Sequence, residues 1–123
     1  MTNYNSGMYI TSSLAMNSLT MKGAIVGIRG NILGAIYRIQ DNREIILGRD
    51  PYLCDVVLYG ERASRKHCSV TYIPEIQMYR VTDYSLNGCF LKDGSRLEKE
   101  RPYKLLHGTE IILGSEENVI KLG

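Results

Sequence analysis

The sequence predicts an all-β domain, an antiparallel sandwich or barrel, and three observations support this prediction. From Met21 onward the apolar residues come in short runs, and none sustains the i, i+3, i+4, i+7 spacing of an amphipathic helix. The runs are rich in Ile, Val, Tyr and Leu, which favour strands. Turn dipeptides such as Asn87-Gly88 and Asp93-Gly94 separate them. Many short strands without crossover helices indicate an antiparallel fold.

Nine segments have the composition of strands. In chain order they are 24–28, 35–39, 44–47, 68–73, 78–83, 89–91, 103–106, 110–113 and 118–122. In the fourth segment, Cys68, Val70 and Tyr72 are expected to share one face of the sheet, because successive side chains of a strand point to opposite faces. Residues 50–66 are the exception, since only Val56, Val57 and Leu58 look strand-like there. A long loop inside a compact domain usually has a function.

Length and charge set the domain organisation and exclude some partners. A chain of 123 residues is sufficient for one domain. Its 15 Lys and Arg against 13 Asp and Glu give a net charge of +2, too small for a protein that coats nucleic acid or an anionic membrane. Residues 1–20 contain no charged side chain, so we expect a flexible polar tail at 1–20 and one domain at 21–123. Thr2, Thr11 and Thr20 are possible phosphorylation sites in a tail that is more simply interpreted as a linker.

The cysteines indicate a reducing compartment. Cys54, Cys68 and Cys89 are odd in number and widely separated, which fits neither a disulfide framework nor paired zinc ligands. We expect reduced, mainly buried thiols and no metal or other cofactor. The chain has no apolar stretch long enough for a membrane span and no signal peptide. The sequence therefore predicts a cytoplasmic protein without membrane insertion.

The basic residues are concentrated in the long loop. Residues 61–67 contain three cations and one acid, 3 − 1 = +2, which equals the excess of the whole chain. Ser64 and His67 lie among these cations, and Gly48-Arg49 directly precedes the loop. Side chains and backbone amides on loops can converge on an anion. Because loops gather at the ends of a sandwich, residues 83–88 are expected to join the same site.

These motifs, in this order, resemble the forkhead-associated (FHA) domain family. The resemblance rests on Gly48-Arg49, on Ser64-Arg65-Lys66-His67, on Asn87-Gly88 and on residues 106–114, and it extends over about residues 21–123. It implies a sandwich of about eleven strands that binds phosphothreonine peptides through loops at one end. The implied function is that of a signalling adaptor downstream of a Ser/Thr kinase, with a Thr-phosphorylated protein as partner.

The resemblance also implies a role for each matching residue. Arg49, Ser64 and Arg65 would bind the phosphate, with Arg65 alternatively reaching the peptide backbone, and Asn87 would hold the peptide main chain. Lys66 would add attraction, and Gly48, His67 and Gly88 would support the site. Leu86 departs from the family, which commonly has Thr or Ser there, so the phosphate is expected to lose one ligand and affinity to be moderate. Cys89 replaces a common Thr at an expected core position.

Other functions are weaker interpretations of the same residues. An enzyme is not expected, because Ser64 and His67 lack an orienting acid and oxyanion donors, and Cys68 points away from His67. The glycines at 23, 27, 30 and 34 lack the Gly-Lys-Ser/Thr ending of a phosphate-binding P-loop and indicate a closely packed hairpin. The main alternative is phosphate-independent assembly through a sheet face, for which Leu86 and nine tyrosines argue. The expected state is a monomer or weak dimer, and nucleic-acid binding ranks third.

Overall fold

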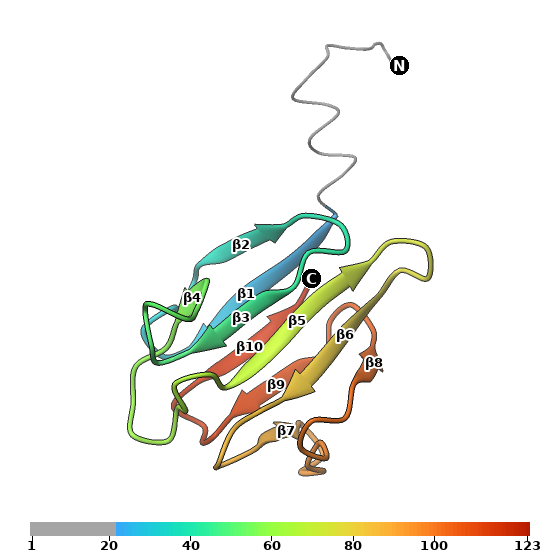
Figure 1. Ribbon diagram of the computed structural model, residues 1–123. Coiled ribbons are helices and arrows are strands. Elements are labelled where there is room, and N and C mark those ends of the chain that lie inside the picture. Colours follow the sequence, from blue (N-terminus) through green and yellow to red (C-terminus); the bar gives the residue numbers. More distant parts are fainter. Residues whose placement is uncertain (1–21) are drawn as a thin grey trace.

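The computed structural model describes residues 22–123, which form ten strands in two stacked sheets (Figure 1). The strands are β1 (Gly23–Arg29), β2 (Ile36–Ile39), β3 (Ile45–Gly48), β4 (Val56–Val57), β5 (Cys68–Ile73), β6 (Met78–Asp83), β7 (Cys89–Leu91), β8 (Tyr103–Leu105), β9 (Glu110–Leu113) and β10 (Val119–Leu122). All nine predicted segments overlap a strand, and β4 is the tenth. The all-β sandwich is therefore confirmed, with ten strands where about eleven were expected. The tail predicted at 1–20 lies outside the described residues.

Each sheet contains five strands. One has the order β2-β1-β10-β9-β7 and the other β4-β3-β5-β6-β8. The pairings are antiparallel except that of β3 with β4, which is parallel and places Leu47 opposite Val56. This exception follows from the 49–55 connection, which crosses over before β4 begins. No helix long and apolar enough to span a membrane occurs within residues 22–123.

The core lies between the sheets and is formed by the inward face of each strand. On β5, Cys68, Val70 and Tyr72 belong to it, as the alternation predicted. Leu47, Ile111 and Leu122 are among the fully buried members contributed by other strands. Burying one such aliphatic side chain contributes about 1.5–3 kcal/mol. The apolar alternation is thus what holds the strand ends, and hence the loops, in place.

The glycine-rich start of the domain forms a close hairpin, as the sequence indicated. Gly27 exchanges backbone hydrogen bonds with Gly34 and Ala35, both at 2.9 Å. A Cβ at Gly27 would lie 1.8 Å from the carbonyl oxygen of Ile32, so no other residue fits there. Gly27 is therefore required by close packing, whereas Gly34, with open space around it and a φ of +84°, allows the turn itself.

The connections β3–β4, β4–β5 and β6–β7 gather at one end of the sandwich, the lower end in Figure 1. They carry the three segments that the sequence analysis singled out. The turn between β5 and β6 lies at the opposite end (Figure 1). The two ends of the sandwich thus carry different loops. The basic run at 61–67 lies in the β4–β5 connection, at the lower end.

Candidate functional site

The first part of the site is the junction of β3 with the loop that precedes β5. Gly48 ends β3, and a Cβ there would lie 2.2 Å from the carbonyl oxygen of Arg65. The backbone N–H of Arg49 donates to the carbonyl of Ser64 at 2.9 Å, and that of Asp50 donates to Arg65 at 3.2 Å. Only glycine allows this approach, which holds Arg49 beside Ser64. The Arg49 side chain itself is exposed.

His67 is fully buried and joins two loops. Its Nδ1 accepts a hydrogen bond from the backbone N–H of Ser64 at 3.1 Å. Its Nε2 lies 2.9 Å from the carbonyl oxygen of Gly88, an acceptor, so Nε2 carries the proton. Burial lowers the pKa of His67, although the Gly88 carbonyl and the Asp83 carboxylate partly oppose this shift. The neutral ring therefore fixes Ser64 relative to Gly88.

Ser64 is half-buried, and its hydroxyl donates to no group within residues 22–123. Its Oγ accepts the backbone N–H of Leu86 at 3.0 Å. A hydroxyl has one hydrogen and two lone pairs, so this bond leaves the O–H free to donate. The same bond brings the tip of the β6–β7 loop against the β4–β5 loop.

The β6–β7 loop is held from within by Asp83 and Ser85, both buried. Asp83 Oδ1 accepts from the Ser85 backbone N–H at 2.9 Å and from the Ser85 hydroxyl at 2.6 Å. The Ser85 hydroxyl in turn accepts the Gly88 N–H at 2.7 Å. Ser85 is thus fully engaged below the surface and does not replace the hydroxyl that Leu86 lacks. Leu86 projects from the loop with 79% of its surface exposed.

Asn87 lies next to Leu86 and is half-buried. Its Nδ2 donates to the carbonyl of Arg62 at 3.3 Å, which ties it to the other loop. Within residues 22–123 its Oδ1 accepts no hydrogen bond. A peptide N–H is the natural donor for such an amide oxygen.

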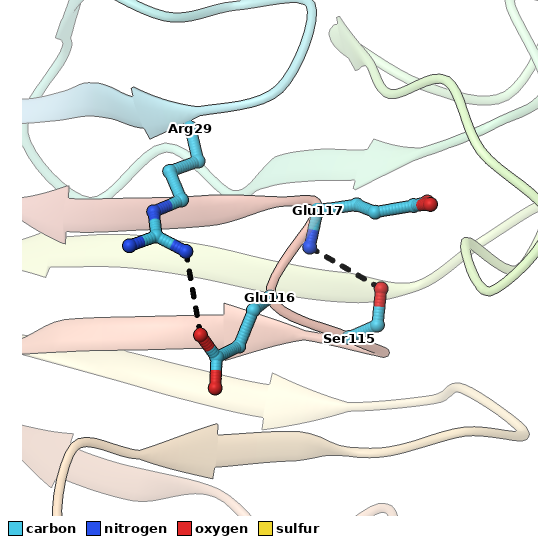
Figure 2. Close-up of polar contacts among 4 residues, drawn as sticks. All are labelled: Arg29, Ser115, Glu116 and Glu117. Carbon is cyan, nitrogen blue, oxygen red and sulfur yellow. Dashed lines mark hydrogen bonds and ion pairs between the residues drawn. The ribbon is translucent and has the colours of Figure 1, made fainter.

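A cleft beside Arg49 is lined by two arginines and one aspartate. It has a volume of about 380 Å³ and is lined by Arg49, Asp50, Pro51, Tyr52 and Arg65. The four ion pairs within residues 22–123 use other cations. One of these cations is Arg29, whose Nη1 lies 3.3 Å from Oε1 of Glu116; Figure 2 shows this pair. The two arginines of the cleft thus keep charge available for an anion.

Lys66 is directed to a neighbouring ring. Its Nζ lies 4.0 Å from the centroid of Tyr84, a cation–π contact. The ammonium therefore adds positive potential near the loops from a fixed position.

Sequence reasoning missed the contribution of residues 50–52 to the cleft. Asp50 closes its own turn, because Oδ1 accepts the Tyr52 N–H at 2.8 Å and its carbonyl accepts the Cys54 N–H at 3.0 Å. Tyr52 is 96% exposed at the rim. An Asp-Pro pair directly after Gly48-Arg49 is a turn signal that could have indicated this wall.

Three buried side chains of the site lie close together, and most of their polar atoms are bonded within the fold. His67, Asp83 and Cys89 place ligating atoms within 4.8 Å of one another. Both ring nitrogens of His67 are already bonded to the backbone, however, and the Ser64 group that contacts His67 is the backbone N–H. The contact with Cys68, together with burial, raises the pKa of Cys89, so its thiol stays protonated. The described cysteines are all free.

Comparison with known proteins agrees with this geometry. The family model described as FHA domain matches residues 45–114, more than half of the chain. No curated protein matches the chain by sequence. The FHA domain of CT664 from Chlamydia trachomatis has a TM-score of 0.71 at 24% identity, covering 81% of this chain and 94% of that one. An FHA domain of an Arabidopsis thaliana hypothetical protein has a TM-score of 0.73 at 21% identity, covering 95% and 93%.

A third similar structure contains a ligand. The N-terminal FHA domain of Rad53p from S. cerevisiae, solved with a phosphothreonine peptide, has a TM-score of 0.63 at 24% identity, covering 81% of this chain and 89% of that one. The match of the family model to more than half of the chain shows that the chain belongs to the FHA domain family, and the solved structures share its fold.

Proposed function

We propose that this chain binds phosphothreonine-containing peptides at the end of the sandwich where Arg49, Ser64 and Asn87 meet. The observation that carries the proposal is that three segments distant in sequence meet at one end of the sandwich and bring donors that have no partner within residues 22–123. Hydrogen bonds from Arg49 N–H to Ser64, from Leu86 N–H to Ser64 and from Asn87 to Arg62 connect these segments. These bonds fix the backbone positions from which Arg49, Ser64 and Asn87 would reach an anion.

The phosphate is the anion that these donors fit best. It carries a charge of about −1.5 to −2 at pH 7 and three strong acceptor oxygens. Arg49 offers a planar fork, Ser64 a free hydroxyl, and Arg65 a second guanidinium in the same cleft. Each charge-assisted bond contributes about 1.5–3 kcal/mol, while association costs at least about 4 kcal/mol, so micromolar affinity is expected.

The peptide main chain is assigned to Asn87. Its amide group can accept from one backbone N–H through Oδ1 while Nδ2 stays anchored to Arg62. Gly48, His67 and Gly88 support this arrangement without touching the ligand. Lys66 adds attraction, and the exposed Leu86 lies where the peptide would pass.

Structural relatives support the proposal by analogy. Besides Rad53p, the MEK1 FHA domain has been solved with a HOP1 pThr318 peptide, and the FhaA FHA domain with the intracellular domain of Rv3910. We infer a non-enzymatic adaptor that recruits Thr-phosphorylated proteins in the cytoplasm, downstream of a Ser/Thr kinase.

A titration of a degenerate phosphothreonine peptide library tests the proposal. Isothermal titration calorimetry would compare wild type with Arg49→Ala, using phosphoserine and unphosphorylated libraries as controls. Loss of one charge-assisted pair is expected to weaken binding about 10- to 100-fold. Arg38→Ala, a change of an exposed arginine on β2, is the matched control and is expected to bind normally. Added salt should weaken binding.

The contrary result is also defined. If wild type does not prefer phosphorylated peptide, the proposal is wrong. A concentration-independent dimer in light scattering that persists in Arg49→Ala would then favour phosphate-independent assembly.

A further inference from the structure

Arg96 lies beside the recognition loops although it is distant from them in sequence. It follows a turn after β7 in which the Gly94 N–H donates to Leu91 and the Leu91 N–H donates to Ser95, at 2.9 and 2.8 Å. An isolated bridge then pairs Arg96 with Phe90. The turn is therefore ordered, and it returns Arg96 to the loop that carries Asn87.

The guanidinium of Arg96 makes two contacts, one with that loop and one with β7, and it lies close to the backbone of Gly88. Its Nη2 donates to the carbonyl of Leu86 at 3.3 Å, and its Cζ lies 5.6 Å from the ring centroid of Phe90. A Cβ at Gly88, whose φ is +95°, would lie 2.7 Å from Arg96 Nε. The side chain is thus pre-organised, which reduces the entropy lost when it binds a ligand.

The charge of Arg96 has no acidic partner in the part of the chain that the structure describes. Within residues 22–123 no carboxylate oxygen lies within ion-pair distance of it. Asp93, in the same turn, instead accepts from the Ser95 N–H and hydroxyl at 2.9 and 2.6 Å. Arg101, a few residues further on, is paired with Glu98 at 3.2 Å. A guanidinium has five N–H donors, and Arg96 uses one of them on Leu86.

Leu86 separates Arg96 from the phosphate side of the site. The Leu86 N–H points to the Ser64 hydroxyl, while its carbonyl points to Arg96. An anion at Arg96 would therefore be a second group, distinct from the one at Ser64. Asn87 follows directly, so a peptide held there passes both positions.

We propose that Arg96 binds an acidic side chain of the bound peptide, so that the preferred ligand is a phosphothreonine flanked by Asp or Glu. This inference rests on the proposed phosphopeptide function. A planar fork fits a carboxylate with two parallel hydrogen bonds. Such a contact would add binding free energy at the loop where Leu86 provides no hydroxyl for the phosphate.

A double-mutant cycle tests the contact. Phosphothreonine peptides in an Ala-Ser background, each with one Glu at a different flanking position, and their Gln counterparts, would be titrated by fluorescence anisotropy. At one flanking position, the Glu peptide should bind the wild-type protein about three- to fivefold tighter than the Gln peptide does, which is the range of an exposed ion pair. In Arg96→Gln this ratio should fall to one, with the Gln peptides bound as by wild type. Arg101→Gln is the matched control and should keep the ratio.

Three results would overturn the inference. They are no Glu preference at any position, a preference that persists in Arg96→Gln, and an equal loss for all phosphopeptides in Arg96→Gln, which would place Arg96 on the phosphate. Arg96→Lys, which keeps the charge without the fork, should keep part of the ratio, and thermal melting of each variant checks folding. Absence of any phosphothreonine preference in wild type would instead refute the proposed function together with this contact.

Discussion

The two histidines lie at opposite ends of the sandwich and are used differently. His67 is buried and bonds to two backbone groups, the Ser64 N–H and the Gly88 carbonyl. His107 lies between two tyrosine hydroxyls, with Nδ1 3.2 Å from Tyr79 and Nε2 3.4 Å from Tyr72. One histidine connects loops, and the other connects side chains of the core.

The polar groups at the two ends also differ in whether they leave hydrogen-bond donors free for a ligand. At the His107 end, the Ala24 N–H donates to the Tyr79 hydroxyl at 3.0 Å, and the rings of Tyr72, Tyr79 and His107 pack within 4.9–5.2 Å. The polar groups of that cluster therefore hydrogen-bond to one another. At the His67 end the backbone is satisfied internally while Ser64 and the arginines keep donors for a ligand. The comparison teaches that a buried imidazole serves a site best when it bonds to backbone and leaves the side chains free.

Removing His67 should have the largest effect. His67→Ala leaves the Ser64 N–H and the Gly88 carbonyl without partners and opens a cavity, so we expect the free energy of unfolding to fall by about 2–5 kcal/mol. Urea denaturation measures this loss, and phosphopeptide titration well below the denaturation midpoint should show lost binding. Normal affinity in a folded His67→Ala protein would contradict the positioning role.

Breaking the other end should affect stability alone. Tyr79→Phe removes the hydroxyl that accepts the buried Ala24 N–H, and an unsatisfied buried donor costs about 1–3 kcal/mol. The same denaturation measurement is expected to show this loss. Phosphopeptide affinity should remain that of wild type, and a parallel drop in affinity would mean that the two ends are coupled.

Introducing a hydroxyl at position 86 should strengthen phosphopeptide binding at the His67 end. Leu86→Thr keeps the backbone bonds to Ser64 and Arg96 and replaces an exposed side chain. One added hydrogen bond to phosphate is expected to tighten binding about three- to tenfold by calorimetry. Leu33→Thr, at another leucine that is 69% exposed, is the control and should change nothing. Unchanged affinity in Leu86→Thr would place the phosphate away from this residue.

Acid should weaken the His67 end by the smallest amount. Burial lowers the pKa of His67 below its ordinary value of 6.5, so below that pH the unfolded chain binds more protons than the folded one. Its contribution to stability is therefore complete above about pH 6.5 and declines as pH falls toward the lower folded pKa. Denaturation curves of wild type and His67→Gln across this range isolate the effect, because other groups titrate in both. If the free energy of unfolding depends on pH in the same way in wild type and in His67→Gln, this contribution of His67 is refuted.

The strands were predictable because each carries its own pattern of apolar and β-branched residues. Which strands pair with each other was not predictable, because the alternation shows which side chains of a strand are buried and does not show which strand lies beside it. The parallel pairing of β3 with β4 depends on how residues 49–55 cross, which is a tertiary property.

The site was predictable to the extent that its residues form local motifs. Gly48-Arg49, Ser64 to His67 and Asn87-Gly88 are adjacent pairs or runs, and the structure brings them together. Arg96 has no such signal, because an isolated arginine looks the same on any surface, and for Tyr52 the only local signal is the Asp50-Pro51 turn before it. The internal use of Ser85 also depends on Asp83 being buried beside it.

The hydrogen bonds that join the loops have a consequence for exchange with solvent. The amides of Arg49, Ser64, Leu86 and Gly88 all donate within the fold, so their hydrogens cannot exchange until these bonds open. His67 directly precedes β5 and bonds to Gly88, which directly precedes β7 of the other sheet, so the buried His67 ring connects the loops to a strand of each sheet. These loop amides should therefore exchange with deuterium nearly as slowly as those of β5. Surface loops would then belong to the same cooperative unit as the central strands.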